Sequence, residues 1–281
     1  MLTVLTELGK KISERWLSLL VVPGFLFVCA VANAAWLGHG HALETDLLVN
    51  RSAVAAHGLE HRPAKVAVFA VLLLLAATGA GIVAAGAAGV VNRVWLDQVR
   101  LPLSWLDRRD RLQRLRSRLV AWRRRRDERV GRPGRPPQYL PARVTWIGDR
   151  VRLTDERVRY QYGMHVALVW PRLWLVTSDA VREHVQAAYD RYTAATGLAG
   201  WAFLYLSLGL RWWPAAVVGV IAGGVAWRRA RTAIEAFCLL AEAAIDTHQQ
   251  QLATSLGITL ADGRIRHKEG NAIDDLLNKN G

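Results

Sequence analysis

The stretch that decides the fold is Val66–Val91, VAVFAVLLLLAATGAGIVAAGAAGVV, which runs for 26 residues without a charge. An α-helix rises about 1.5 Å per residue, so this stretch is long enough to cross the roughly 30 Å hydrocarbon core of a bilayer. Small residues recur in it at every fourth position, at Ala77, Gly81, Ala85 and Gly89. Because small side chains let a second helix come close, we expect this face to support helix packing and self-association.

The first apolar segment, Trp16–Trp36, has the length of a membrane span and a Trp at each end, as the interfacial belts of a bilayer favour. Basic residues precede it and Ala32-Asn33-Ala34 lies near its end, so the segment also has the parts of a cleaved signal peptide. We favour a retained span, because the apolar run is long for a signal peptide and a Trp follows it.

A third apolar region, Thr193–Trp227, is interrupted by Arg211 and Pro214. An Arg at the centre of a bilayer costs at least about 2.5 kcal/mol, so Arg211 should lie at an interface. We therefore expect the region to form a helical hairpin that crosses the membrane twice. Each half is short for a span, which leaves a re-entrant or surface-lying hairpin as the alternative.

The chain of 281 residues carries 37 Lys and Arg against 23 Asp and Glu, a net charge of +14, and 52% of its residues are hydrophobic. Charges and apolar runs are segregated along it, which excludes a wholly disordered chain and is atypical of a soluble enzyme. Basic residues concentrate after Val66–Val91 and again after Trp227, the end of the third apolar region. Both termini and the central part of the chain should therefore be cytoplasmic. The sequence thus predicts a multi-pass protein of the bacterial inner membrane.

The predicted fold class is mainly α: a polytopic membrane protein with two transmembrane hairpins, about four spans, and a small cytoplasmic α or α+β domain. In that domain, Val166–Trp170 is an apolar run that fits a strand or a short buried segment, stopped by Pro171. The domain is small for an independent core, so we expect it to pack on the Ala233–Ile245 helix or on a second subunit. The expected segments are 1–92 for the first hairpin with its outer loop 37–65, 93–137 for an Arg-rich helix and a Pro/Gly linker, 138–192 for the small unit, 193–227 for the second hairpin, and 228–281 for a C-terminal helix and tail.

Residues 93–135 hold 15 Arg and no Lys. Within them, an apolar stripe at helical spacing is formed by Leu112, Leu115, Leu119 and Trp122. A basic amphipathic helix beside a span is typical of a helix that lies on the anionic inner leaflet. Membrane lipids are therefore the expected partners, bound by Trp122, Arg123, Arg124, Arg125 and Arg126. Nucleic acid is not an expected partner, because the chain has no nucleic-acid-binding motif.

Candidate catalytic and metal-binding residues are sparse. The outer loop holds four imidazoles, at His39, His41, His57 and His61, with Glu60 nearby. Such a set can bind a divalent metal, but its spacing lacks a tetrahedral pattern, so we expect no metal and no cofactor. Cys29 and Cys238 lie in apolar runs and are expected to pack rather than to form a disulfide. No catalytic pair is visible, so we expect no enzymatic activity, and an intramembrane enzyme is the alternative.

Three short motifs resemble a known pattern: Ile147-Gly148-Asp149, Tyr162-Gly163-Met164 and Trp170-Pro171-Arg172. They are similar to motifs of an uncharacterised family of multi-pass membrane proteins from actinobacteria and cyanobacteria, which carry a Tyr-Gly and a Trp-Pro-Arg. Asp149 stands where those relatives have Asn, and Ile245 stands where they have Phe. The resemblance implies the membrane topology and supplies no activity.

Two functions follow as hypotheses. The first is an integral membrane anchor or interaction protein, which presents a basic cytoplasmic domain at the inner leaflet to acidic lipids or to a protein partner. The alternative is a homo-oligomeric membrane channel or pore-type effector of a bacterial stress or defence system. Polar groups are few in the predicted spans, which disfavours a polar, selective pathway but leaves a hydrophobic gated pore open.

Overall fold

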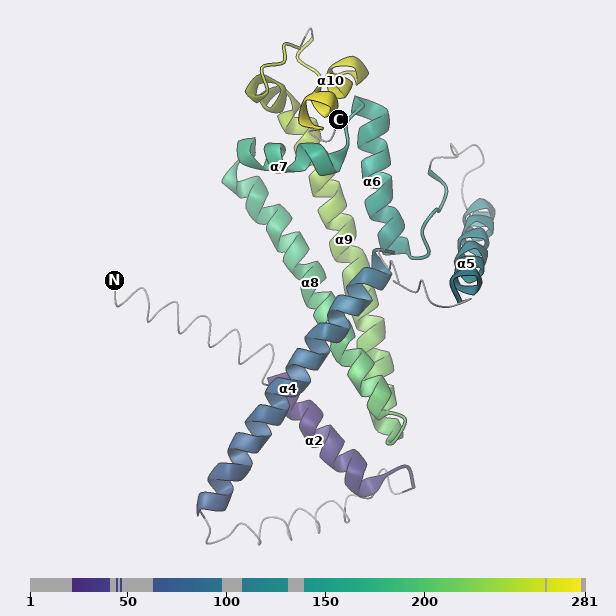
Figure 1. Cartoon of the computed structure of the whole chain (residues 1–281), viewed down its shortest axis with the longest axis vertical. Coiled ribbons are helices and arrows are strands. Elements are labelled where there is room, and N and C mark those ends of the chain that lie inside the picture. Colours follow the sequence, from purple (N-terminus) through teal and green to yellow (C-terminus); the bar gives the residue numbers. More distant parts are fainter. Residues whose placement is uncertain are drawn as a thin grey trace, which may run out of the picture. The chain divides into compact units, whose positions relative to one another are not determined.

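The computed structural model describes residues 22–40, 44, 46, 63–97, 108–130, 139–260 and 262–278. Within these residues all regular structure is helical and no strand occurs, which confirms the prediction of a mainly α fold. Figure 1 labels the eight helices. Their bounds are α2 Val22–Leu37, α4 Pro63–Trp95, α5 Arg108–Val130, α6 Trp146–Tyr162, α7 Val166–Val176, α8 Asp179–Leu208, α9 Trp213–Ser255 and α10 His267–Leu277.

The chain divides into two compact units, and each is built from discontinuous segments. The first comprises residues 1–91 and 195–227, and the second comprises residues 92–194 and 228–281. The long helices α8 and α9 contribute residues to both units. Cys29 and Cys238 are free thiols.

Helix α4 is the main apolar element of the first unit. Among the described residues it is the one helix long and apolar enough to cross a membrane, over Ala64–Trp95. Its large side chains point outward, as shown by Leu72, Leu75 and Ile82, which are 58%, 63% and 66% exposed. Helix α2 is apolar but shorter, and residues 16–21 of the predicted first span lie outside the described residues. Four spans therefore remain a prediction.

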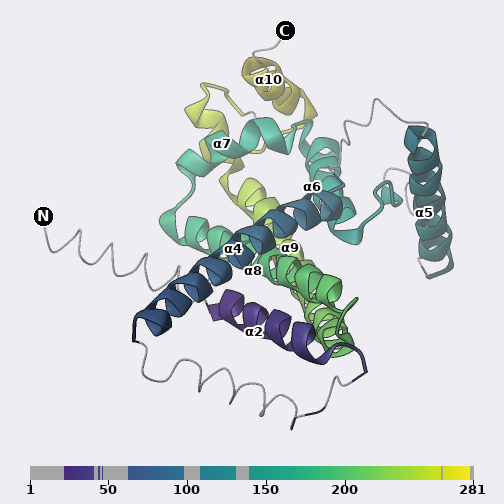
Figure 2. The same ribbon diagram turned by 60° about the horizontal axis from the view of Figure 1, so that its bottom comes forward.

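Small residues bring three helices of the first unit into close contact. A Cβ added to Gly24 of α2 would overlap the carbonyl of Ala77, and one added to Gly200 of α8 would overlap the carbonyl of Ala84. Both Ala77 and Ala84 lie on α4 and are almost fully buried. Figure 2 shows α2 and α8 beside α4. The close approach of these backbones is the packing mode that small residues permit.

The predicted packing face of α4 is only partly used inside the chain. Ala77 and Gly81 are buried, whereas Ala85 and Gly89 are exposed, and Ala84 takes the next buried position. The reason is helical geometry: four residues turn a helix by about 400°, so a strict four-residue row drifts by about 40° per step. A buried row follows alternating steps of four and three instead.

Helices α8 and α9 form the hairpin expected from the third apolar region, with its turn between Leu208 and Trp213. At the turn, the His39 imidazole Nε2 lies 2.9 Å from the Leu210 carbonyl oxygen. Tyr205 of α8 makes an edge-to-face contact with Phe27 of α2, at 5.3 Å between the ring centroids. Residues 195–227 of the hairpin thus belong to the same packed unit as α2.

The second unit has a continuous hydrophobic core. Helices α6, α7 and α10 contact one another, and α9 adds Ile245 and Leu252 to the same core. Its fully buried residues include Met164, Leu173 and Ile273. Residues 233–245 belong to α9, and Ile245 lies in this core. The expectation that the small unit packs on that helix is therefore confirmed. Figure 1 shows α6, α7 and α10 around the C-terminal half of α9.

The expectation of a strand at Val166–Trp170 is wrong, because these residues begin helix α7, and Pro171 lies inside that helix. A run of five apolar residues carries no periodicity that separates a strand from a buried helix. The helix starts where the Asp155 carboxylate accepts the Val166 amide N–H at 3.0 Å. Pro171 has no amide N–H, so the carbonyl of Ala167 lacks its helical donor. Ala167 is exposed, so water can reach this carbonyl.

We expect Gly200→Ala to destabilise the protein by about 1–3 kcal/mol, because the new methyl group meets the Ala84 carbonyl and forces α8 away from α4. The matched control is Gly197→Ala on the same helix, where a Cβ meets nothing within 4 Å. It should be neutral or stabilising by up to about 1 kcal/mol. Thermal unfolding in detergent, followed by circular dichroism, measures both. Equal midpoints for the two variants would contradict the close contact.

Candidate functional site

The start of helix α6 carries a buried carboxylate that gathers several donors. Thr145 caps the helix, accepting the Gly148 amide N–H at 3.0 Å. Asp149 lies in the first turn, where a negative charge interacts favourably with the helix dipole, and is 4% exposed. Its Oδ1 accepts the amide N–H groups of Ala142 and Arg143 at 2.9 Å each. The carboxylate therefore orders the backbone that leads into α6.

The other oxygen of Asp149 fastens helix α5. Arg123 donates from its guanidinium to Asp149 Oδ2 at 2.6 Å and to the Thr145 carbonyl at 2.9 Å. Arg124 donates to the Pro141 carbonyl at 2.7 Å, and Arg116 pairs with Asp97 at 2.6 Å. Arginines on one side of α5 are thus used to hold the helix against the rest of the second unit.

The other side of α5 is apolar and exposed. Leu115, Leu119 and Trp122 are 53%, 49% and 57% exposed, so no described residue covers the predicted stripe. The Arg126 guanidinium lies 5.6 Å from the centroid of the Trp122 ring, at cation–π distance. The side chain of Leu112 lies outside the described residues.

The structure therefore divides the predicted lipid-binding set in two. Arg123, which is half-buried, and Arg124, which is exposed, donate hydrogen bonds to other segments of the second unit. Trp122 is exposed within the stripe, and Arg125 and Arg126 are exposed beside it. Arg118 is also exposed, and a helical wheel places it on the stripe side, although the sequence had not singled it out. The number of arginines in a segment does not show which of them hold α5 against the protein and which are free to contact a ligand or a membrane.

A second carboxylate joins α6 to α9. Glu242 of α9 receives hydrogen bonds from Thr154 at 2.8 Å and Arg150 at 3.0 Å, and Arg157 pairs with it at 3.1 Å. Burial raises the pKa of Glu242, but the bonds from Thr154 and Arg150 and the charges of both arginines outweigh burial and lower it. Sequence reasoning missed this cluster, because its members lie more than 80 residues apart.

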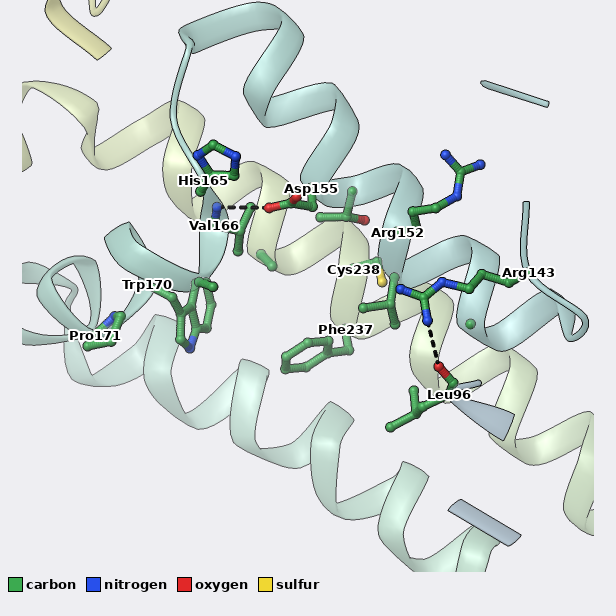
Figure 3. A pocket seen from close by; sticks show the side chains of 15 residues that line it. Leu96, Arg143, Arg152, Asp155, His165, Val166, Trp170, Pro171, Phe237 and Cys238 are labelled. Carbon is green, nitrogen blue, oxygen red and sulfur yellow. Dashed lines mark hydrogen bonds between the residues drawn. The ribbon is translucent and has the colours of Figure 1, made fainter. Parts of the chain in front are cut away.

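A cavity of about 510 Å³ opens between α6, α7 and α9. Figure 3 shows Arg143 and Leu96 at one end of it, Trp170 and Pro171 at the other, and Phe237 between them. Burial raises the pKa of the Cys238 thiol, which also lines the cavity. The lining residues are Leu96, Arg143, Gly148, Val151, Arg152, Thr154, Asp155, His165, Val166, Ala167, Trp170, Pro171, Phe237, Cys238 and Ala241.

Metal ligands do not cluster in the part of the chain that the structure describes, where no group of three His, Cys, Asp or Glu side chains converges. The predicted loop set falls mostly elsewhere: His41, His57, Glu60 and His61 lie outside the described residues. His39 is described, and its ring contacts the Leu210 carbonyl.

Comparison of the chain with protein-family models, curated proteins and solved structures gives no match. The resemblance to the actinobacterial and cyanobacterial membrane family stays a prediction. The motif residues have structural roles here: Asp149 fastens α5, and Gly163 ends α6 in a left-handed conformation at φ 75°. Trp170 packs on Phe237 with ring centroids 6.2 Å apart.

Glu242→Gln should destabilise the protein at neutral pH by about 1–3 kcal/mol, since Arg150 and Arg157 lose their charged acceptor. The folded-state pKa of Glu242 is below its ordinary value of 4.5, so its contribution is present above about pH 4.5 and is lost as pH falls through the folded-state pKa. The wild-type advantage over Glu242→Gln should therefore shrink below about pH 4.5. Thermal unfolding from pH 3 to pH 8 measures it.

The matched control is Glu235→Gln, an exposed glutamate on the same helix, which should leave the unfolding curve nearly unchanged. A difference between wild type and Glu242→Gln that stayed constant over this pH range would show that the carboxylate charge is not what the arginines require.

Proposed function

We propose that this protein is an integral membrane anchor and interaction protein of the bacterial inner membrane, and that helix α5 lies on the cytoplasmic leaflet. The observation that carries the proposal is the exposed stripe of Leu115, Leu119 and Trp122, flanked by exposed arginines. An apolar stripe bordered by Arg matches the division between acyl chains and anionic headgroups. A protein partner with an acidic, apolar surface is the competing occupant of the same face.

The membrane part of the proposal rests on α4, whose exposed aliphatic side chains suit lipid. In the proposed topology, α2 and the hairpin of α8 and α9 complete four crossings. Arg93 and the arginines of α5 follow α4, which favours a cytoplasmic location for that end and for both termini.

Fastening α5 by one side has an energetic consequence for membrane binding. A free amphipathic helix would lose its orientation entropy when it binds a surface, whereas α5 is already held by Arg116 and Arg123. Each Arg near an anionic surface contributes about 1 kcal/mol of attraction. The exposed Arg118, Arg125 and Arg126 flank the stripe, so together they should contribute roughly 3 kcal/mol.

The test uses the full-length protein in nanodiscs with a nitroxide at Leu119→Cys, in a background in which Cys29 and Cys238 are Ala. In anionic lipid, the label should enter the acyl region and become accessible to oxygen, and in neutral lipid it should stay in water. Salt near 1 M should release it, because the Debye length falls to about 3 Å. A label at Ser117→Cys, on the opposite side of α5, should stay in water throughout.

Changing Arg118, Arg125 and Arg126 to Gln should abolish the insertion of the Leu119 label. The matched control removes the same charge elsewhere, by changing Arg172, Arg182 and Arg191 of α7 and α8 to Gln, and should leave insertion intact. A Leu119 label that stays aqueous in anionic lipid would overturn membrane binding by α5 and favour a protein partner for the stripe.

The homo-oligomeric channel is the second candidate, and the exposed small residues of α4 favour it. Ala85 and Gly89 face outward, and a Cβ at Gly86 or Gly89 would meet nothing within 4 Å. This surface lies free of the contacts that Ala77 and Ala84 make with α2 and α8. It suits the close approach of a second copy of α4.

Gly86→Leu with Gly89→Leu should reduce self-association in bilayers by at least about tenfold, because the larger side chains block backbone approach. Val83→Leu with Val90→Leu is the matched control, since it enlarges exposed positions of the same helix that are not small. Single-molecule photobleaching counts the subunits, and planar-bilayer conductance shows whether the assembly conducts. Unchanged subunit counts would remove this face from the argument for a channel.

A further inference from the structure

We infer that the cavity between α6, α7 and α9 binds a single-chain anionic amphiphile, such as a fatty acid, taken from the membrane. This inference rests on the proposed membrane location. In this site, the alkyl chain of the ligand lies along the apolar wall of the cavity, and its anionic head group contacts Arg143. The cavity of about 510 Å³ falls in the range of small-molecule sites, which are mostly apolar with a few placed polar groups.

The apolar wall comes from all three helices. Val151 of α6, Trp170 of α7 and Phe237 of α9 face the same space, as Figure 3 shows for the two aromatic rings. Trp170 and Phe237 pack in a tilted arrangement at 6.2 Å between centroids, which gives the wall a continuous aromatic face. Val151 is 38% exposed, so the protein leaves this apolar surface partly open to a ligand.

The cationic end is formed by Arg143. Its guanidinium has five N–H donors, and one nitrogen makes long contacts of 3.3 and 3.4 Å with the carbonyls of Leu96 and Asp97. Among the described residues, no ion pair involves Arg143, so its positive charge is available to an anion. Arg152 lines the same end but is already paired with Asp149 at 3.4 Å.

The opposite end is closed to a second charged head. Asp155 accepts the Val166 amide N–H, and His165 contacts the Asp274 carboxylate, so both polar groups are used by the protein. Trp170 and Pro171 border this end. The resulting polarity, one available cation at one end and aromatic groups toward the other, fits a molecule with one anionic head and one apolar tail.

The membrane as the source of the ligand follows from the position of Leu96 in the chain. Leu96 lines the cationic end and directly follows Trp95, the last residue of the candidate span α4. If α4 spans the bilayer as proposed, its C-terminal end lies at the headgroup level, where anionic lipid heads are concentrated. A soluble aromatic acid shares this ligand chemistry, and the experiment separates the two.

The experiment places the full-length protein in neutral phosphatidylcholine nanodiscs with a long-chain fatty acid that carries a diazirine in mid-chain. After illumination, mass spectrometry maps the labelled residues. The expected labels lie on Val151, Trp170 and Phe237, above the general labelling of α4 by lipid. Arg143→Gln should lower cavity labelling about tenfold through the lost charge-assisted bond. The exposed Arg191→Gln is the matched control and should not.

Three further arms make the result decisive. A diazirine probe with the same alkyl chain but an alcohol head group should label the cavity weakly, and to the same extent in wild type and Arg143→Gln. Ala167→Phe, at an exposed position on the cavity rim, should block labelling even if Arg143→Gln fails to fold. Unlabelled oleate should compete, and benzoate should not.

The proposal is overturned if the extent of cavity labelling is the same in wild type, Arg143→Gln and Ala167→Phe. It is also overturned if the cavity is not labelled at all. Competition by benzoate as strong as that by oleate overturns the membrane source. Nitroxide insertion at Leu119 is measured in parallel, on the same purified protein reconstituted into anionic nanodiscs. Insertion without cavity labelling refutes only this inference, whereas loss of insertion refutes the membrane role of α5.

Discussion

The buried carboxylate of Asp149 is the interaction on which the arrangement of the second unit depends. A buried charge is stable only when it is paired and hydrogen-bonded, so this one fixes whatever supplies its donors. The donors come from three places: the backbone at Ala142 and Arg143, the guanidinium of Arg123 on α5, and Arg152 on α6 itself. One side chain thus sets the entry to α6, the position of α5 and the backbone that carries the cationic end of the cavity.

Helix α6 transmits this order because its other face is also held by charge. Glu242 joins it to α9 through Thr154 and two arginines, while Tyr162 donates to Asp246 at 2.6 Å near the C-terminal end of α6. Partly buried ion pairs and hydrogen bonds have strict geometry, so they fix the rotation of a helix more tightly than apolar contact does. The cavity walls on α6 and α9 therefore face each other in one defined register.

Sequence reasoning reached the elements whose signal is long and local. The uncharged run of α4 and the mainly α composition are visible in one dimension, because each depends on neighbouring residues. It failed where the signal is short or distant. The five apolar residues from Val166 carry no period, and the row of small residues drifts around α4. Arg123 lies 26 residues from Asp149, and Thr154 lies 88 residues from Glu242. The four consecutive arginines of α5 look equivalent in sequence, yet successive helical positions point about 100° apart, so Arg123 reaches Asp149 while Arg126 lies over Trp122.

The contacts around Asp149 also connect the two surfaces that we assign to lipid, the exposed stripe of α5 and the cavity. The guanidinium of Arg123 donates to the backbone carbonyl of Arg143 as well as to Asp149, so the residue that fastens α5 also touches the residue at the cationic end of the cavity. A ligand that moved the Arg143 backbone would alter the fastening of α5, and a membrane that pulled on α5 would alter the cavity. Any such coupling must be reciprocal in free energy. Under the two proposals, both surfaces bind anions and depend on one buried carboxylate, so we expect occupancy of the cavity and docking of α5 on the leaflet to be linked in free energy rather than independent.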